Sequence, residues 1–421
     1  SYSEKSLSER QTVLLKYIRL INDLISKICL SVSSHSDALD CMDDERLQNA
    51  MNCLVDLQKM LHASTMLQDE IKIGMKQTPV SNNGAPLRSF TAVSKVLQEL
   101  QLQSWTLMYK LYRESLDQNK DKVEKPNKAL FEFIRAVHQV LGARSLCGGS
   151  DRVFLKLAKL EVLRFRNDAE EQNDDFDLEF AQILYDMFGL KCFLNPSYAL
   201  REHNCMHDAF VDKTSGMQAV DLLLNLASRI KMSELPKHPL KDTIEKVHGI
   251  INRKKPSEAI LRNRDVYRAY LKSNINPLDM YRCLRGECEL ALAPVPAEHA
   301  VLAANGWYFL MGHISLSKFR AQKRIGPTAT EDLNISVAFF VQALEYSMDD
   351  WELWFRLAQA YDSKIEEAVS WTADKINGDM DELVTWQRAA IHCYTMAVSL
   401  AMRYAEPSAE TRAKFGEIYA D

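Results

Sequence analysis

Basic side chains gather between residues 237 and 285 of the 421-residue chain. Arg253, Lys254 and Lys255 are consecutive in this span, and Arg262 and Arg264 follow shortly after them. If these five cations share one face, they can contact DNA phosphates or an acidic protein surface through charge attraction. The same spacing also suits the solvated outside of a helix, so the sequence leaves both interpretations open.

Acidic side chains gather in two other places. One is the stretch 168–179, which includes Asp174 and Asp175, and the other is the sequence NGDMDE, which includes Asp379 and Asp381. Each can contact a basic partner surface. The alternative is a flexible segment that its charge keeps soluble.

The cysteines and histidines do not follow the spacing of a standard zinc site. The residues that come nearest to it are Cys192, His203, Cys205 and His207, and the pair Cys283 and Cys288. Neither group has the CxxC spacing of a zinc finger. The nine cysteines are odd in number and scattered, as buried thiols are in a reducing compartment. We therefore predict no metal and no cofactor, and we interpret Cys283 and Cys288 as small apolar positions on one helix.

The sequence motifs of common enzyme active sites are absent. It contains no glycine-rich phosphate loop, no GxSxG elbow and no HExxH, so we predict that the chain is not an enzyme. The net charge of −5 argues against a dedicated nucleic-acid binder. No apolar run is long enough to span a membrane. The first residues do not resemble a signal peptide, and we expect them to be a boundary inside a longer protein.

The elements that must position these residues are helices. The 14 glycines and 12 prolines are too few for the turns of an all-β fold of this length. Apolar residues recur with helical spacing throughout, and Asp43 and Asp44 suit the N-cap of a helix that carries Leu47 and Leu54. We predict an all-α fold, an irregular helical-repeat solenoid. The sequence SELPKHP suggests a boundary between an irregular region, 1–235, and a repeat region, 236–421.

The repeat region is expected to consist of paired helices. Their predicted ranges are 240–251, 257–272, 278–293, 298–320, 332–347, 351–376, 381–405 and 408–420. In the stretch WELWFRLAQAY, Trp354, Leu357, Ala358 and Tyr361 match the first helix of a tetratricopeptide repeat. The other positions assigned to repeat packing are Trp307, Leu310, Phe340, Ala343, Ala390, Tyr394 and Ala397.

The residue types at these positions follow from packing. A small residue such as Ala358 lets two helix backbones approach closely, and the aromatic residues fill the gap between neighbouring pairs. The turn inside each pair is longer than a standard repeat needs. Trp371 lies in the second of these turns, and we expect it to dock on the solenoid and extend the helix through Ile376. The tip with Asp379 and Asp381 is then the exposed element.

A family resemblance rests on the same stretch. The Trp-x2-Leu helix, the inserted SWTADKIN and the helix QRAAIHCY resemble the large helical-repeat subunit of the HIR/HIRA histone chaperone complex. That family includes the fungal HIR subunits and the animal calcineurin-binding protein cabin. The resemblance covers about residues 300–405, with a looser match at 185–205.

The resemblance implies a non-enzymatic, nuclear scaffold subunit for replication-independent nucleosome assembly. The implied partners are WD-repeat subunits, an ubinuclein-like subunit and histones, bound directly or indirectly, and a homo-oligomer and a DNA contact through the basic region stay open. The alternative is a tetratricopeptide-type adaptor of another assembly that binds peptides in a concave groove.

Overall fold

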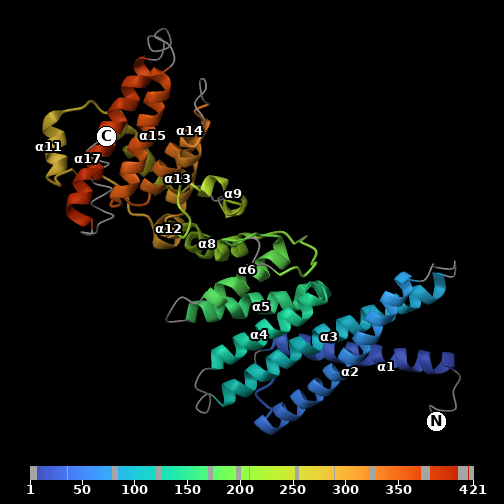
Figure 1. Ribbon diagram of the computed structural model, residues 1–421. Helices are drawn as coiled ribbons and strands as arrows, with labels where there is room; N and C mark the ends of the chain where they lie inside the picture. Colours follow the sequence, from blue (N-terminus) through green and yellow to red (C-terminus); the bar gives the residue numbers. More distant parts are fainter. Residues whose placement is uncertain are drawn as a thin grey trace. The chain divides into compact units, whose positions relative to one another are not determined.

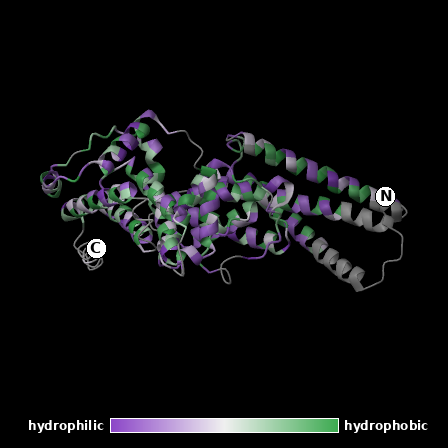
Figure 2. Cartoon of the chain, turned by 90° about the horizontal axis from the view of Figure 1, so that it is seen from above, coloured by the Kyte–Doolittle hydropathy of each residue, from purple (hydrophilic) through white to green (hydrophobic). Residues whose placement is uncertain are grey.

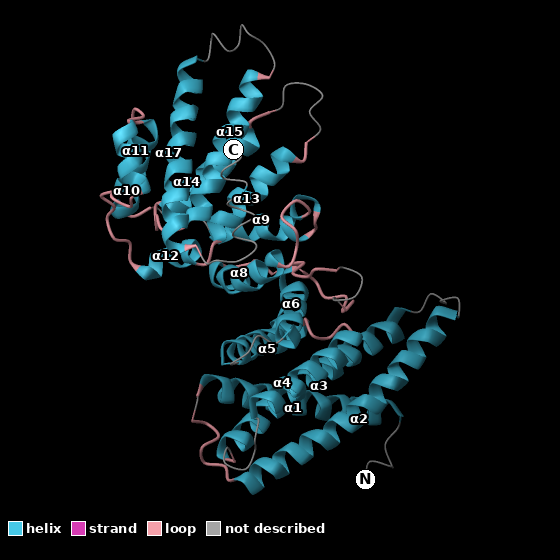
Figure 3. Cartoon of the chain, turned by 60° about the vertical axis from the view of Figure 1, so that its left-hand side comes forward, coloured by secondary structure: helices cyan, strands magenta, loops and turns pink. Residues whose placement is uncertain are grey.

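Helices make up all the regular structure in the part of the chain that is described. The computed structural model describes residues 7–35, 37–77, 84–119, 126–168, 174–195, 201–207, 209–251, 256–288, 290–322, 329–370, 380–405 and 416. These ranges contain helices and loops but no strand (Figure 3), so the all-α prediction is confirmed. None of their helices combines the length and apolar character that a bilayer crossing requires. Hydrophobic and hydrophilic residues instead alternate around most helices (Figure 2).

The chain forms two compact units, residues 1–210 and 211–421. This division falls earlier in the sequence than the boundary expected after residue 235. That earlier expectation concerned a change from irregular helices to repeats, and it stays a prediction.

The described residues of unit 1 contain helices α1 to α6 (Figure 1). They are α1 (Leu7–Ser34), α2 (Asp44–Gln77), α3 (Gly84–Gln118), α4 (Pro126–Ala143), α5 (Gly149–Asp168) and α6 (Asp174–Phe188). Helices α1 and α2 both pack on α3, which also contacts α4 and α5, and α5 packs on α6. Helix α3 is therefore the element that joins the first three helices to the last three.

The first core of unit 1 forms where α1, α2 and α3 meet. Leu47 of α2 and Leu100 of α3 are almost fully buried there. Gln58 of α2 crosses this core and donates a hydrogen bond to the backbone carbonyl of Gln101 at 3.0 Å. The predicted N-cap of α2 is confirmed, because an oxygen of Asp43 accepts a hydrogen bond from the Arg46 amide at 2.9 Å.

Unit 2 contains the helices after residue 211. They are α8 (Lys213–Ser228), the short η3 (Leu235–Lys237), α9 (Leu240–Ile251), α10 (Glu258–Lys272), α11 (Pro277–Leu284), α12 (Ala297–Ala304), α13 (Trp307–Arg320), α14 (Glu331–Leu344), α15 (Trp351–Val369) and α17 (Met380–Tyr404). Consecutive helices α13, α14, α15 and α17 pack on their neighbours, and α10 and α11 pack on α17 (Figure 3).

Trp354 organises the centre of unit 2. Its side chain is fully buried, and its indole Nε1 donates a hydrogen bond to the Met348 carbonyl at 2.9 Å. The rings of Tyr267 and Tyr270 on α10 lie 5.8 and 6.2 Å from it. One indole thus contacts α10 while it fixes the turn that leads into its own helix, α15.

Most of the positions assigned to repeat packing are buried. Trp307, Leu310, Phe340, Ala343, Leu357, Ala358, Ala390 and Ala397 lie in the core, whereas Tyr361 and Tyr394 are half-buried. Trp371 lies outside the described residues. The assignment of the helix pairs to the tetratricopeptide class stays a prediction.

Three predicted helix ranges need correction. The helix expected at 278–293 ends at Leu284, and the one expected at 298–320 is broken into α12 and α13. Gly286 and Gly306, with φ of 81° and 77°, take the left-handed conformation that ends a helix. Helix α15 ends at Val369 rather than Ile376, and residues 371–379 lie outside the described part.

Truncating Trp354 should destabilise unit 2. We expect Trp354→Ala to lower the free energy of unfolding by about 3–5 kcal/mol, because a fully buried aromatic ring leaves a cavity. Chemical denaturation measures this value. Tyr281→Ala removes a ring that is 58% exposed and should leave the midpoint nearly unchanged. Equal stability of the two variants would contradict the packing described here.

A pair of glycine substitutions tests the approach of α13 to α14. A Cβ on Gly312 would lie 2.6 Å from the Phe340 ring, so Gly312→Ala should cost about 1–3 kcal/mol through overpacking. A Cβ on Gly249 of α9 meets nothing within 4 Å, so Gly249→Ala should stabilise the protein by about 0.5–1 kcal/mol. Thermal melts of both variants should therefore shift in opposite directions, and a shared direction would refute the close approach.

Candidate functional site

A groove of about 860 Å³ lies in unit 2. Helices α10 and α14 form its walls, with further residues from α8, α12, α15 and α17. Its apolar lining includes Ile260, Leu271, Val337 and Val341. The size and lining suit a short peptide segment or a few side chains of a partner.

Cations outnumber carboxylates along this groove. Its charged lining consists of Lys213, Arg264, Arg268, Lys272, Lys364, Glu298 and Glu345. Lys213 and Lys272 are exposed, and no ion pair of either is recorded among the described residues. Opposing charge is nearby, because Asp381 and Glu382 border an adjoining hollow of about 640 Å³. The groove therefore has a basic side and an acidic rim.

Lys364 and Trp386 form the end of the groove that borders α17. The Lys364 ammonium lies 4.4 Å from the centre of the Trp386 ring and donates a hydrogen bond to Asn334 Oδ1 at 2.8 Å. Burial lowers the pKa of Lys364, and this effect exceeds the opposing attraction of Glu382. The cation–π contact holds the ring of Trp386 against the wall.

The opposite wall depends on an ion pair. Arg264 of α10 donates to both carboxylate oxygens of Glu345, at 2.5 and 3.0 Å, and Glu345 is only 2% exposed. The hydrogen bond to Glu345 raises the pKa of Arg264. Such a two-point contact fixes the position of α10 beside the end of α14.

Asn263, the residue before Arg264, strengthens the same junction. Its amide nitrogen donates to the carbonyl oxygens of Ala293 and Glu345 at 3.0 and 2.9 Å, and its oxygen accepts from the Ala293 amide at 2.7 Å. Asn263 is buried. Three hydrogen bonds from one side chain thus join α10, the loop at Ala293 and the end of α14.

Two of the predicted basic residues, Arg262 and Arg264, lie on different faces of α10. Arg264 lines the groove but serves mainly as an internal partner of Glu345. Arg262 is exposed and lies two residues earlier on α10, about 200° around the helix, so the two do not share a face. Arg253, Lys254 and Lys255 lie outside the described residues.

The predicted acidic residues differ in their surroundings. Asp174 and Asp175 are exposed in the first turn of α6, where Asp175 contacts Arg135 at 3.3 Å. Asp177 of the same stretch is buried and pairs with Arg166 at 2.7 Å, so part of the stretch is structural rather than a linker. Asp381 is exposed and borders the hollow described above, and Asp379 lies outside the described residues.

The cysteines and histidines considered as zinc ligands also lie in different surroundings. Cys283 is buried on α11 and lies 3.2 Å from the Met396 sulfur, but Cys288 lies beyond the end of that helix, which corrects the expectation of one shared helix. The ring of His207 packs on Tyr185 at 4.7 Å, and Cys192 is buried. His203 and Cys205 instead join a buried polar cluster in unit 1 that the sequence interpretation missed.

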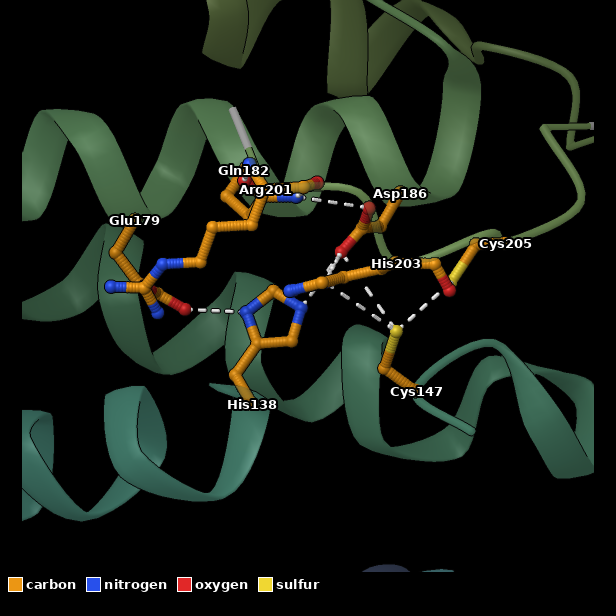
Figure 4. A network of polar contacts seen from close by, with 8 residues as sticks. All are labelled: His138, Cys147, Glu179, Gln182, Asp186, Arg201, His203 and Cys205. Carbon is orange, nitrogen blue, oxygen red and sulfur yellow. Dashed lines mark hydrogen bonds and ion pairs between the residues drawn. The ribbon is translucent and has the colours of Figure 1, made fainter. Parts of the chain in front are cut away.

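That cluster brings together residues that are far apart in the sequence. His138, Cys147 and Asp186 meet His203 there, and one nitrogen, sulfur or oxygen atom from each lies within 4.8 Å of the other three (Figure 4). A signal existed in the sequence. His138 continues the apolar stripe of Leu130, Ile134 and Leu141 on α4, so a polar residue occupies a core position.

Removing Arg264 should weaken unit 2 more than removing Arg262. We expect Arg264→Ala to cost about 1–3 kcal/mol, because Glu345 is left buried without its cation. Arg262→Ala makes the same chemical change at an exposed position, and its free energy of unfolding should stay within about 0.5 kcal/mol of that of the unmodified protein. Urea denaturation compares the two, and a similar loss in both would show that the ion pair contributes nothing.

Comparison with known proteins places both units in one family. The model of the histone transcription regulator 3 helical domain matches residues 1–209, and the model of the HIR3 helical bundle domain matches residues 230–421. A histone transcription regulator 3 homolog of Aspergillus fumigatus is 41% identical over 423 residues, which cover 100% of this chain and 20% of the relative.

Other relatives carry the same name. The homolog of Aspergillus oryzae is 37% identical over 99% of this chain and 20% of its own length, and that of Schizosaccharomyces pombe is 20% identical over 95% of this chain and 24% of its own length. The chain spans about a fifth of the length of the two Aspergillus relatives. From the matches to both units, the chain belongs to the histone transcription regulator 3 family.

Proposed function

We propose that the chain is a non-enzymatic scaffold segment of a nuclear histone chaperone complex of the HIR type, which assembles nucleosomes outside replication. The family assignment supports the histone-related role, because the relatives are named histone transcription regulators. The helical architecture supports a scaffold, since helices packed in series expose long surfaces to several partners at once.

The groove of unit 2 is the observation that supports partner binding most directly. We assign it to an acidic segment of another subunit, with one or two apolar side chains that enter between α10 and α14. Lys213, Arg268 and Lys272 supply the complementary charge, and Ile260, Leu271 and Val341 supply the apolar contacts. Basic histone tails suit this groove poorly because they carry the same sign of charge.

The remaining partner assignments are proposals of the same kind. WD-repeat subunits, an ubinuclein-like subunit and histones are the partners that the resemblance implies. Histones are proposed to contact acidic surfaces such as the start of α6, where Asp174 and Asp175 are exposed. A DNA contact through Arg253, Lys254 and Lys255 would weaken steeply with added salt, because phosphate neutralisation releases counterions.

The alternative function is a peptide-binding adaptor of another assembly. The same groove favours it, because a peptide in a helical groove is a common recognition mode. The identity of the co-purifying proteins separates the two functions. WD-repeat subunits together with histones support the chaperone complex, whereas their absence beside a stoichiometric unrelated partner supports the adaptor.

Reversing two groove charges should remove one subunit from the complex. In the full-length protein that contains this chain, we expect Lys213→Glu combined with Lys272→Glu to reduce co-purification of the acidic partner at least tenfold. Two like charges would then face the partner's carboxylates. Quantitative mass spectrometry of the purified complex measures the loss. Carbodiimide treatment of the unmodified complex should also join Lys213 or Lys272 to a carboxylate of that partner.

The matched control is Arg262→Glu combined with Arg282→Glu. Both arginines are exposed, neither lines the groove, and the change in net charge is the same. This control should keep the partner. Retention of every subunit by the groove variant would show that the groove is not the binding site, and an equal loss in both variants would show a general charge effect.

A further inference from the structure

Four potential metal ligands meet in the interior of unit 1. His138 comes from α4, Cys147 from the turn between α4 and α5, Asp186 from the last turn of α6, and His203 from the segment 201–207 (Figure 4). Their exposed fractions are 1%, 0%, 0% and 3%. The interior of a protein rarely holds so many ionisable groups unless they serve one another or a bound ion.

The donor atoms face a common centre. His138 Nε2 and His203 Nδ1 lie 2.9 and 2.5 Å from Asp186 Oδ2. Cys147 Sγ lies 3.8 Å from Asp186 Oδ2 and 3.8 Å from His203 Nδ1. A tetrahedral zinc site with bonds of about 2.0–2.3 Å separates its donors by about 3.3–3.8 Å. The two sulfur distances fit this range. The nitrogen–oxygen distances must lengthen by about 0.4–0.8 Å to admit the ion, and the widest donor separation, within 4.8 Å, must shorten.

Neighbouring side chains orient these donors as they do around metal ions. Glu179 Oε1 accepts a hydrogen bond from His138 Nδ1 at 2.5 Å, which leaves Nε2 directed at the centre. Gln182 donates to Asp186 Oδ1 at 3.1 Å, which leaves Oδ2 directed at the centre. A carboxylate behind a histidine ligand is the usual outer shell of a zinc site, because it fixes the ring and makes it more basic.

The segment that carries His203 is held in place from two sides. The side-chain amide of Gln182 accepts from the Arg201 backbone amide at 2.8 Å and donates to the Arg201 carbonyl at 3.1 Å. On the other side, a Cβ on Gly142 of α4 would lie only 2.3 Å from the His203 ring, so the ring rests on the helix backbone. Only glycine at position 142 admits the ring at this distance.

The charges of the cluster favour a bound cation. Asp186 and Glu179 place two carboxylates in the interior, with exposed fractions of 0% and 6%. Two buried carboxylates attract positive charge to the site.

Cys205 adds a second sulfur beside Cys147. The two sulfur atoms lie 2.9 Å apart, well beyond the 2.03–2.05 Å of a disulfide, and both cysteines are free thiols. Cys205 is thus a direct neighbour of the Cys147 sulfur but lies outside the four-residue cluster.

We propose that His138, Cys147, Asp186 and His203 bind one structural Zn²⁺ ion that joins α4, the α4–α5 turn, α6 and the segment 201–207. Nitrogen, sulfur and oxygen donors together select zinc over magnesium or calcium, which require oxygen ligands. The ionised cysteine and aspartate balance the charge of the ion. Burial of all four ligands leaves no open position for a substrate, so the role is structural.

Metal analysis tests the proposal. The untagged 421-residue chain, purified without chelators, should contain about one zinc ion per chain when its metal content is measured by inductively coupled plasma mass spectrometry. His203→Ala and Cys147→Ala should each lose it. The controls are His207→Ala, which alters a histidine of the same segment that packs on Tyr185, and Cys41→Ala, which removes an exposed thiol. Both controls should keep the zinc.

Two further measurements separate a metal site from a folding defect. Chelation of the unmodified chain should lower its melting temperature by several degrees, and Zn²⁺ but not Mg²⁺ should restore it. Cobalt substitution should give a thiolate-to-cobalt absorption band that Cys147→Ser loses and His207→Ala keeps. A chain that contains no zinc and whose melting temperature does not respond to Zn²⁺ would overturn the proposal, as would an intact mass that shows a Cys147–Cys205 disulfide.

Discussion

Helices can approach one another only as closely as the side chains between them allow, and the packing in both units depends on glycine at the closest points. A Cβ added at Gly216 of α8 would lie 2.8 Å from Ile251, and a Cβ added at Gly312 of α13 would lie 2.6 Å from Phe340. Gly142 of α4 admits the His203 ring in the same way. The same constraint therefore governs an apolar helix junction in unit 2 and the polar cluster of unit 1.

The charged side chains divide according to what surrounds them. Arg264 and Asp177 belong to charge-rich stretches of the sequence, yet both form internal ion pairs that position helices. Lys272 belongs to the same basic stretch as Arg264, and Lys213 lies outside it, but both lysines border the groove of unit 2. A run of like charges therefore identifies a region, while burial and partners decide which members hold the fold together and which face a partner.

Local patterns predicted the helices well and their breaks poorly. The N-cap at Asp43 and the range of α9 follow from short-range signals, and the structure agrees with both. The ends of α11 and α12 coincide with Gly286 and Gly306, which take the left-handed conformation that commonly follows a helix. The cluster around Asp186 was missed for a different reason. Its members are separated by up to 65 positions, from 138 to 203, so no spacing rule applies to them.

The three hydrogen bonds of Asn263 have a consequence for how this protein can change over evolutionary time. Its partners at positions 293 and 345 are main-chain atoms, which every residue except proline possesses in full. Position 293 can therefore accept many side chains without loss of the junction, whereas position 263 needs an amide that both donates and accepts. The junction between α10 and α14 therefore depends on the side chain of one residue, Asn263. Substitutions in the loop at 293 can be tolerated, whereas a substitution at position 263 of the helix removes the hydrogen bonds.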